Sequence, residues 1–166
     1  MAKTVTLYHF TCEHHLPKIM TDGYLKTTES NLSITRPHAG PDVDWLGTMP
    51  EMRPGGSYGL SDGTKSIDVE GRNVLLADKT AIRFTVEVPA RDAHKWDVWA
   101  RRWGMHKRTF EAFQKAAPNS KQQRMVERPI TSTEWVEVRH MHTGEVFDWT
   151  DPTVVTRVQK DPRFTY

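Results

Sequence analysis

The sequence predicts one α+β domain that covers residues 1–166. Several short segments alternate apolar and polar residues, as strands with one buried face do. Two other segments carry their apolar residues at helical spacing. Hydrophobic residues make up 37% of the chain and charged residues 27%, which is typical of a globular domain rather than of a disordered chain.

The first predicted unit is a strand followed by a short helix. Residues 4–11 read TVTLYHFT, alternate in polarity and are rich in strand-forming residues. Thr11 can cap the helix that follows, whose apolar stripe includes Ile19 and Met20. Gly23 is expected to end this helix, because glycine readily adopts the left-handed conformation of a C-cap.

The middle of the chain combines short strands with long polar segments. Residues 43–48 (VDWLGT) and 73–77 are expected to be short strands, and residues 80–88 (TAIRFTVEV) give the clearest strand pattern. Residues 27–42 and 49–73 contain many prolines and glycines and are expected to be loops. Long loops in compact domains often serve as lids or binding loops, and whether 49–73 closes over a ligand stays open.

The second half of the chain begins with two predicted helices. Three tryptophans at helical spacing predict a helix over 96–104, and a second helix carrying two phenylalanines is expected to end at Pro118. The tryptophan stripe is expected to be core rather than a surface on which nucleobases stack. Alternating segments then predict strands over 133–139, 145–149 and 154–158.

Positive charge is concentrated in residues 91–128. The whole chain has a net charge of +2, whereas this stretch holds ten basic and four acidic residues. Such a stretch indicates an anionic partner such as a nucleic acid, or else a solvated helix face. The residues expected to contact nucleic acid are Arg101, Arg102, Lys107 and Arg108.

Composition also limits the compartment and the metal chemistry. No apolar run approaches the roughly 18 residues that span a bilayer, and the first ten residues lack the apolar core of a signal peptide, so we expect a cytoplasmic protein without a membrane partner. The single cysteine, Cys12, excludes an internal disulfide and is expected to be a small buried hydrophobe. A zinc site built from His9, Cys12, His14 and His15 is an alternative, but its spacing fits no common structural site, and we expect no metal.

Three predicted strands carry polar residues suited to glycosyl transfer from NAD⁺. Cleavage of the nicotinamide–ribose bond gives the ribose oxocarbenium character, as in glycoside cleavage. A carboxylate can stabilise this charge and deprotonate the nucleophile, a histidine can hold a ribose, an aromatic ring can stack on nicotinamide, and backbone beside a glycine can pair with the carboxamide. Glu134, His9, Trp45 and Gly47 are residues of these types on or beside predicted strands.

The motifs around these residues resemble those of the ADP-ribosyltransferase-fold family. The opening LYHFTCEHHLPKIMTDGYL is similar to the L-[YW]-H-[FI]-T strand, the Leu-Pro-x-Ile helix and the Gly-Leu exit of that family. This pattern occurs in DNA-targeting toxins of the DarT group, more loosely in RNA 2′-phosphotransferases, and in short proteins of actinobacteria and their phages, which the chain resembles most. VDWLGT looks like the family's V-W-L-T strand, and TEWVEV looks like the strand that opens with the catalytic glutamate.

The resemblance covers about a quarter of the chain and implies roles for individual residues. It implies split antiparallel sheets with flanking helices, NAD⁺ as substrate, His9 and Glu134 as catalytic residues, and a bacterial or phage-infected cell as the setting. The residues implied to bind NAD⁺ are Tyr8, His9, Phe10, Thr11, Trp45, Leu46, Gly47, Thr48 and Arg83. No clear equivalent of the DarT arginine is found, and Arg36, Arg53 and Arg83 are the candidates for a pyrophosphate clamp.

These expectations lead to one main hypothesis and two alternatives. The main hypothesis is a mono-ADP-ribosyltransferase that modifies a macromolecule, most favourably a DNA base. The first alternative is a related enzyme, an RNA 2′-phosphotransferase or an NAD⁺ hydrolase. The second is a phage protein that binds a nucleotide or a nucleic acid without turnover. The main hypothesis requires His9 and Glu134 to meet in one crevice.

Overall fold

The computed structural model describes residues 2–28, 41–51, 60–117 and 119–165. Within these ranges an antiparallel sheet of six strands is combined with four α-helices, which confirms the predicted α+β class. None of the helices in these ranges combines the length and the apolar character that a bilayer span requires.

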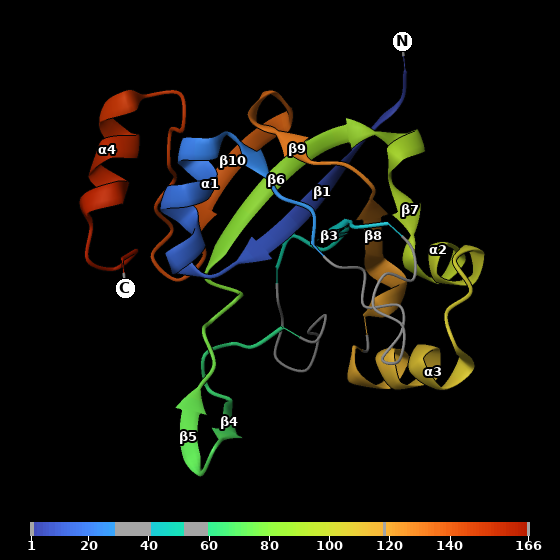
Figure 1. Cartoon of the computed structure of the whole chain (residues 1–166). Helices are drawn as coiled ribbons and strands as arrows, with labels where there is room; N and C mark the ends of the chain where they lie inside the picture. The colour runs from blue at the N-terminus through green and yellow to red at the C-terminus, as the bar shows by residue number, and fades with distance from the viewer. Residues whose placement is uncertain (1, 29–40, 52–59, 118, 166) are drawn as a thin grey trace.

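The six-stranded sheet consists of two three-stranded halves in the order β10-β6-β1-β3-β8-β7 (Figure 1). The strands of the first half are β10 (Trp135–His140), β6 (Ile82–Pro89) and β1 (Thr4–Thr11). The strands of the second half are β3 (Asp44–Gly47), β8 (Gln123–Val126) and β7 (His94–Lys95). β1 and β6 pair along their full length, whereas the described residues of β1 and β3 pair only at Tyr8 and Gly47. Beyond this single pair the two halves diverge.

The first half-sheet packs against the helices near the two ends of the chain. A 3-10 helix (Glu13–His15) leads into α1 (Leu16–Asp22), and Gly23 ends α1 with a φ of 74° and an N–H donated to the Ile19 carbonyl at 2.9 Å. α4 (Pro152–Lys160) lies beside α1 in Figure 1. The buried side chains of this core include Leu7, Phe84, Val158 and Phe164.

The second half-sheet has a separate aromatic core. α2 (Trp96–Arg102) and α3 (Lys107–Ala116) cover it, and Trp96 and Trp99 are each only 1% exposed. The Trp96 ring stacks on that of Phe113 with centroids 4.4 Å apart. Trp103 is 41% exposed, so the prediction of a buried tryptophan stripe is confirmed for two residues and wrong for the third. The position predicted to end the second helix, Pro118, lies outside the described residues.

The predicted strand over 154–158 is wrong, because these residues belong to α4. The Asp151 carboxylate accepts from the Thr153 N–H at 2.9 Å, and Pro152 occupies the first turn, so both residues favour a helix start. Val154 and Val158 then lie one helical turn apart and face the core of the first half-sheet. Five residues, VVTRV, are too few to distinguish this helical period from that of a strand.

Other element boundaries also differ from the predictions. A two-stranded hairpin consists of β4 (Ser66–Val69) and β5 (Arg72–Leu75). β4 occupies part of the segment expected to be a loop, and β5 confirms the strand expected over 73–77 for residues 73–75. Residues 145–149 form an isolated bridge through Val146 rather than a strand. β8, β7 and the small sheet of β2 (Tyr24–Leu25) and β9 (Ile130–Thr131) have no counterpart among the predicted strands.

Candidate functional site

A pocket of about 340 Å³ opens where β1 and β3 diverge. Both half-sheets contribute to its wall, together with α3 and residues flanking two segments that lie outside the described residues. Its described lining consists of Tyr8, His9, Phe10, Thr11, His15, Thr28, Trp45, Leu46, Gly47, Leu60, Lys79, Phe113 and Gln123. The pocket therefore combines the first two predicted binding strands in one cavity.

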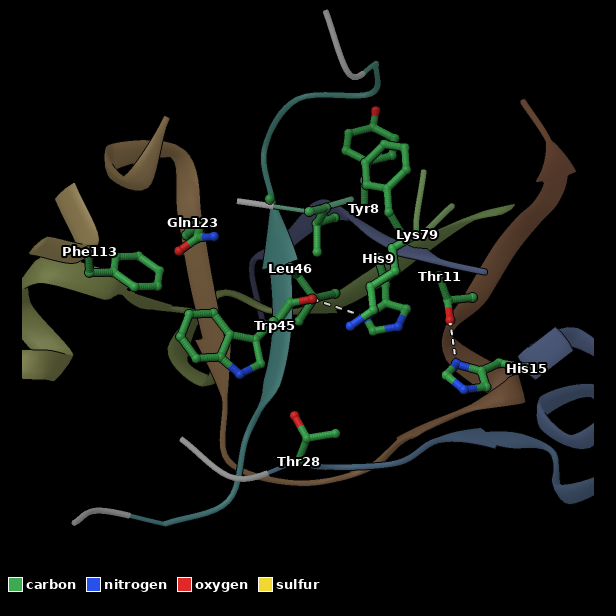
Figure 2. Close-up of a pocket in the computed structure, with 13 residues that line it drawn as sticks. Tyr8, His9, Thr11, His15, Thr28, Trp45, Leu46, Lys79, Phe113 and Gln123 are labelled. Carbon is green, nitrogen blue, oxygen red and sulfur yellow. Dashed lines mark hydrogen bonds between the residues drawn. The ribbon is translucent and has the colours of Figure 1, made fainter. Parts of the chain in front are cut away.

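His9 bridges the two strands at the point where they separate. Its Nδ1 lies 3.0 Å from the carbonyl oxygen of Trp45, so Nδ1 carries the hydrogen and donates to that oxygen (Figure 2). Burial lowers the pKa of His9, and the nearby His15 lowers it further, although the bond to the Trp45 carbonyl opposes both effects. The neutral ring consequently keeps an unprotonated Nε2, which can accept a hydrogen bond from a hydroxyl group.

The side of the pocket beside β1 carries a second imidazole and a cation. The Thr11 hydroxyl lies 2.9 Å from Nδ1 of His15, so Thr11 holds this ring instead of capping the helix as predicted. Burial lowers the pKa of His15, and the positive charge of Lys79 adds to this effect. Lys79 is thus the permanent cation of the described lining. An ammonium group beside neutral imidazoles favours a phosphate-bearing ligand.

The opposite side of the pocket has an aromatic wall. Figure 2 shows Trp45, Phe113 and Gln123 together on one side of β3, with His9, Thr11 and His15 on the other. The Trp45 and Phe113 ring centroids are 5.6 Å apart, with 32° between the ring planes. Gln123 lies directly across from Gly47 in the sheet, so its side chain faces the same way as Trp45. A planar ring of a ligand can therefore stack on the aromatic side chains while its edge faces the Gln123 amide.

Comparison of this chain with protein-family models, with curated proteins and with solved structures finds no match.

Glu134 lies outside the lining of the pocket, so the structure does not bring it together with His9. Its carboxylate oxygens lie 2.6 and 2.8 Å from the guanidinium nitrogens of Arg128, which also contacts Asp92 at 3.0 Å. The same carboxylate accepts from the backbone N–H of Thr131 at 3.1 Å, as part of a capping box. Arg128 lowers the pKa of Glu134, which keeps its carboxylate ionised and bound.

Arg83 and Thr48 do not belong to the described lining either. Arg83 donates to Glu137 at 2.7 Å and to the Pro50 carbonyl at 2.9 Å, and its guanidinium lies 5.4 Å from the Tyr8 ring centroid. Arg83 is therefore paired with Glu137 and does not belong to the described lining of the pocket, although it lies beside the lining residue Tyr8. The other two candidate clamps, Arg36 and Arg53, lie outside the described residues.

The residues predicted to contact nucleic acid are all exposed, Arg101 and Arg102 on α2 and Lys107 and Arg108 on α3. Arg102 lines a second cavity of about 300 Å³ beside β7, together with Arg91, His94 and Lys95. No acidic residue belongs to the described lining of this cavity. We name this set the cationic groove. Arg101 instead lies 5.5 Å from the Phe110 ring centroid, and Lys107 is 3.9 Å from Glu111.

Several lining residues were missed because their contribution depends on tertiary contacts. Lys79 and Thr28 lie in segments without regular patterns, and Gln123 begins a four-residue strand that was not predicted. The pairing of β8 with β3 is what brings Gln123 to the pocket. The alternative zinc site is not supported, because the described residues contain no group of three or more histidine, cysteine or acidic side chains placed to hold a metal.

Proposed function

We propose that this chain binds NAD⁺ in the pocket between β1 and β3 and transfers ADP-ribose from it to a nucleic acid. The observation that carries the proposal is the composition of this pocket, whose described lining combines an aromatic wall, a neutral imidazole and an ammonium group. NAD⁺ presents a cationic pyridine ring, ribose hydroxyls and a pyrophosphate. The volume of about 340 Å³ is at the lower end of ligand sites.

Each part of the cofactor has a complementary group in the described lining. The indole of Trp45 can stack on the pyridinium ring and stabilise its positive charge through its π face. Nε2 of His9 can accept a hydrogen bond from a ribose hydroxyl, because its pKa is lowered and its Nδ1 is already committed to Trp45. Lys79 can neutralise phosphate charge.

The proposed transfer breaks one bond and forms one bond at the anomeric carbon of the ribose. Nicotinamide leaves with the electron pair of its C–N bond, and a nucleophilic atom of the acceptor bonds to the same carbon and loses a proton. The resemblance assigns Glu134 as the base for that proton. In this structure Glu134 is ion-paired to Arg128 and lies outside the described lining of the pocket, so the transfer step requires this carboxylate to leave Arg128 and reach the ribose, whereas NAD⁺ binding does not.

Binding without turnover is a second candidate function. The observation that favours it is that no aspartate or glutamate belongs to the described lining of the pocket. A site that binds NAD⁺ without a carboxylate near the ribose has less means to stabilise an oxocarbenium ion.

RNA 2′-phosphate transfer has weaker support, because it requires several cations around a phosphate and the described lining holds one lysine.

The test is product analysis with NAD⁺ labelled in its adenylate part. The protein is incubated with single-stranded DNA, duplex DNA, or RNA with and without a 2′-phosphate, and free nicotinamide and labelled acceptor are quantified. Nicotinamide release with label on a nucleic acid supports the transferase. Calorimetric binding of NAD⁺ without release supports the second candidate, and absence of NAD⁺ binding contradicts both. Glu134→Gln, tested for retained fold and NAD⁺ affinity, then shows whether this carboxylate acts in the chemical step.

A further inference from the structure

Gln123 is a buried polar residue at the edge of the pocket with an unsatisfied hydrogen-bonding group. It begins β8, is only 4% exposed, and its side-chain Oε1 has no hydrogen-bond partner among the described residues. Of the described residues with such an atom, Gln123 is the one that lines the pocket. A buried acceptor without a donor costs free energy, so this atom is available for a ligand that supplies an N–H or O–H group.

The polar groups next to Gln123 are already paired. The Gln122 side-chain oxygen accepts from the Thr48 hydroxyl, and the main-chain oxygen of Gln123 accepts from Arg124 at 2.9 Å. The residue across the sheet is Gly47, which has no side chain to cover the amide. The side-chain amide of Gln123 is thus left facing the pocket, as Figure 2 shows beside Trp45 and Phe113.

The aromatic wall fixes the orientation of a ring that reaches this amide. Trp45 and Phe113 form the wall, and Phe113 is held from behind by stacking on Trp96 at 4.4 Å. A planar ring stacked on Trp45 presents its edge, rather than its face, to Gln123. Hydrogen-bond donors on such rings lie in the ring plane, so an amino group at that edge can reach the amide oxygen.

We propose that Gln123 is a specificity-determining residue, whose side-chain amide accepts a hydrogen bond from an amino group on a planar ring stacked against Trp45. The inference deepens the proposed function, since NAD⁺ carries this chemistry in two places. The 6-amino group of adenine and the carboxamide of nicotinamide both place an N–H donor at the edge of a flat ring. A glutamine amide can also donate to a neighbouring ring nitrogen, as in its two-bond recognition of adenine.

The test compares NAD⁺ with two analogues that each lack one of these amino groups. Nicotinamide hypoxanthine dinucleotide replaces the adenine amino group by an oxo group, and nicotinic acid adenine dinucleotide replaces the carboxamide by a carboxylate. Affinities are measured by calorimetry for the unmodified protein and for Gln123→Leu, Gln123→Glu and Gln114→Leu. Gln114 is exposed on α3, adjacent in sequence to Phe113, and provides a matched control.

We expect one analogue to bind the unmodified protein about tenfold or more weakly than NAD⁺, because the amide oxygen then faces an acceptor. The analogue that is rejected identifies the ring. Gln123→Leu is expected to bind NAD⁺ about tenfold more weakly than the unmodified protein does. Its affinities for NAD⁺ and for the two analogues are expected to differ by less than about twofold. Gln123→Glu retains an acceptor and is expected to keep the preference, and Gln114→Leu is expected to match the unmodified protein.

Equal affinity for all three dinucleotides, or discrimination that survives in Gln123→Leu, would overturn the inference while leaving NAD⁺ binding intact. Binding of adenosine monophosphate and of nicotinamide mononucleotide tests the case in which the proposed function fails but the inference holds. If one mononucleotide binds through Gln123 and NAD⁺ does not bind, the proposed function fails and the inference stands. If none of these ligands binds a protein with native circular dichroism, both are overturned.

Discussion

The Glu134 carboxylate and the Arg128 guanidinium form a two-point ion pair, with oxygen–nitrogen distances of 2.6 and 2.8 Å. The pair joins the turn before β10 to the segment that follows β8, and Arg128 extends it to Asp92. A residue whose sequence context indicates catalysis therefore has a structural role in this conformation. The two roles make different predictions for the same substitution.

Removing the charge of Glu134 is expected to destabilise the fold. Glu134→Gln should lower the free energy of unfolding by roughly 1–3 kcal/mol near neutral pH, because Arg128 loses a charged partner. Arg128 lowers the pKa of Glu134, so the stabilisation is present above the unfolded-state pKa and is lost as pH falls through the folded-state pKa. The difference between the two proteins, measured by urea unfolding, should shrink in acid.

The control for this prediction is Glu111→Gln. The Glu111 side chain is 61% exposed and lies 3.9 Å from Lys107, so its loss should change stability by less than about 0.5 kcal/mol. Equal effects of the two substitutions at neutral pH would contradict a structural role for the Glu134 ion pair.

His9 is expected to bind ligand in its neutral form. His9→Ala should weaken NAD⁺ binding about tenfold, since it removes the Nε2 acceptor and leaves the Trp45 carbonyl without its donor. Burial lowers the pKa of His9, so the folded protein binds this proton less readily than the unfolded chain. Stability should therefore fall as pH decreases below the usual histidine range.

Titration of the His9 ring by NMR provides the measurement. A pKa above the usual histidine value, or NAD⁺ affinity that improves on acidification, would argue against the assigned tautomer and role.

Asp44 should limit stability at high pH. This carboxyl is 1% exposed, and burial raises its pKa to about 8, although the Ile130 backbone and Arg128 oppose the rise. Because the folded state holds the proton more tightly than the unfolded state, stability falls as pH rises between the ordinary value of 3.8 and about 8. Asp44→Asn should relieve this cost by about 1–3 kcal/mol in alkali and by less in acid.

Chemical unfolding at about pH 5 and about pH 9 tests the sign. Asp42→Asn, at an exposed position two residues away, is the matched control and should show no such difference. A larger gain for Asp44→Asn at the lower pH would contradict the buried neutral carboxyl.

Lys79 is expected to recognise phosphate. Lys79→Ala should weaken adenosine monophosphate binding about fivefold to tenfold and leave adenosine binding unchanged, because the nucleoside lacks the charged group. Lys65→Ala, at an exposed position next to β4, controls for the loss of one positive charge. Similar losses for nucleotide and nucleoside would show that Lys79 does not contact phosphate.

The cationic groove is expected to bind the nucleic-acid acceptor. Replacing Lys95 and Arg102 by alanine should weaken binding of a single-stranded oligonucleotide and reduce the salt dependence of log K by about 1.4, for two lost phosphate contacts. Fluorescence anisotropy over a salt series measures both quantities. The control replaces Arg72 and Lys160, exposed residues on β5 and α4, and should leave the slope unchanged. Equal slopes for the two double variants would remove the groove from the acceptor site.

The sequence predicted the elements that have strong local signals. The strand at 4–11 and the Gly23 helix end follow from alternation and from the conformational freedom of glycine, and both were found as expected. The two predicted motifs around His9 and Trp45 meet in one pocket, which local patterns alone did not require. The rest depended on pairing between distant segments, such as β8 with β3, which leaves no trace in residue periodicity.

The same limitation explains the candidate residues that lie elsewhere. The expectations for Glu134 and Arg83 rest on their residue types, on their positions in predicted strands and, for Glu134, on the family resemblance. Their actual environments are set by Arg128 and Glu137, which approach from other segments of the chain. An ionised side chain in a strand pattern carries no local signal that distinguishes a catalytic partner from a structural ion pair.

The β4–β5 hairpin stands away from the sheet, and all eight of its strand residues are exposed (Figure 1). An isolated two-stranded ribbon is marginally stable in water, so its amide hydrogens should exchange well before those of β1 and β6. Its tip at Glu70 and Gly71 adopts positive φ angles of 53° and 78°, and neither residue belongs to the two hydrophobic cores. A fluorophore or affinity tag can be inserted at this tip without disturbing the sheet, which provides a means of following ligand binding at a distance from the pocket.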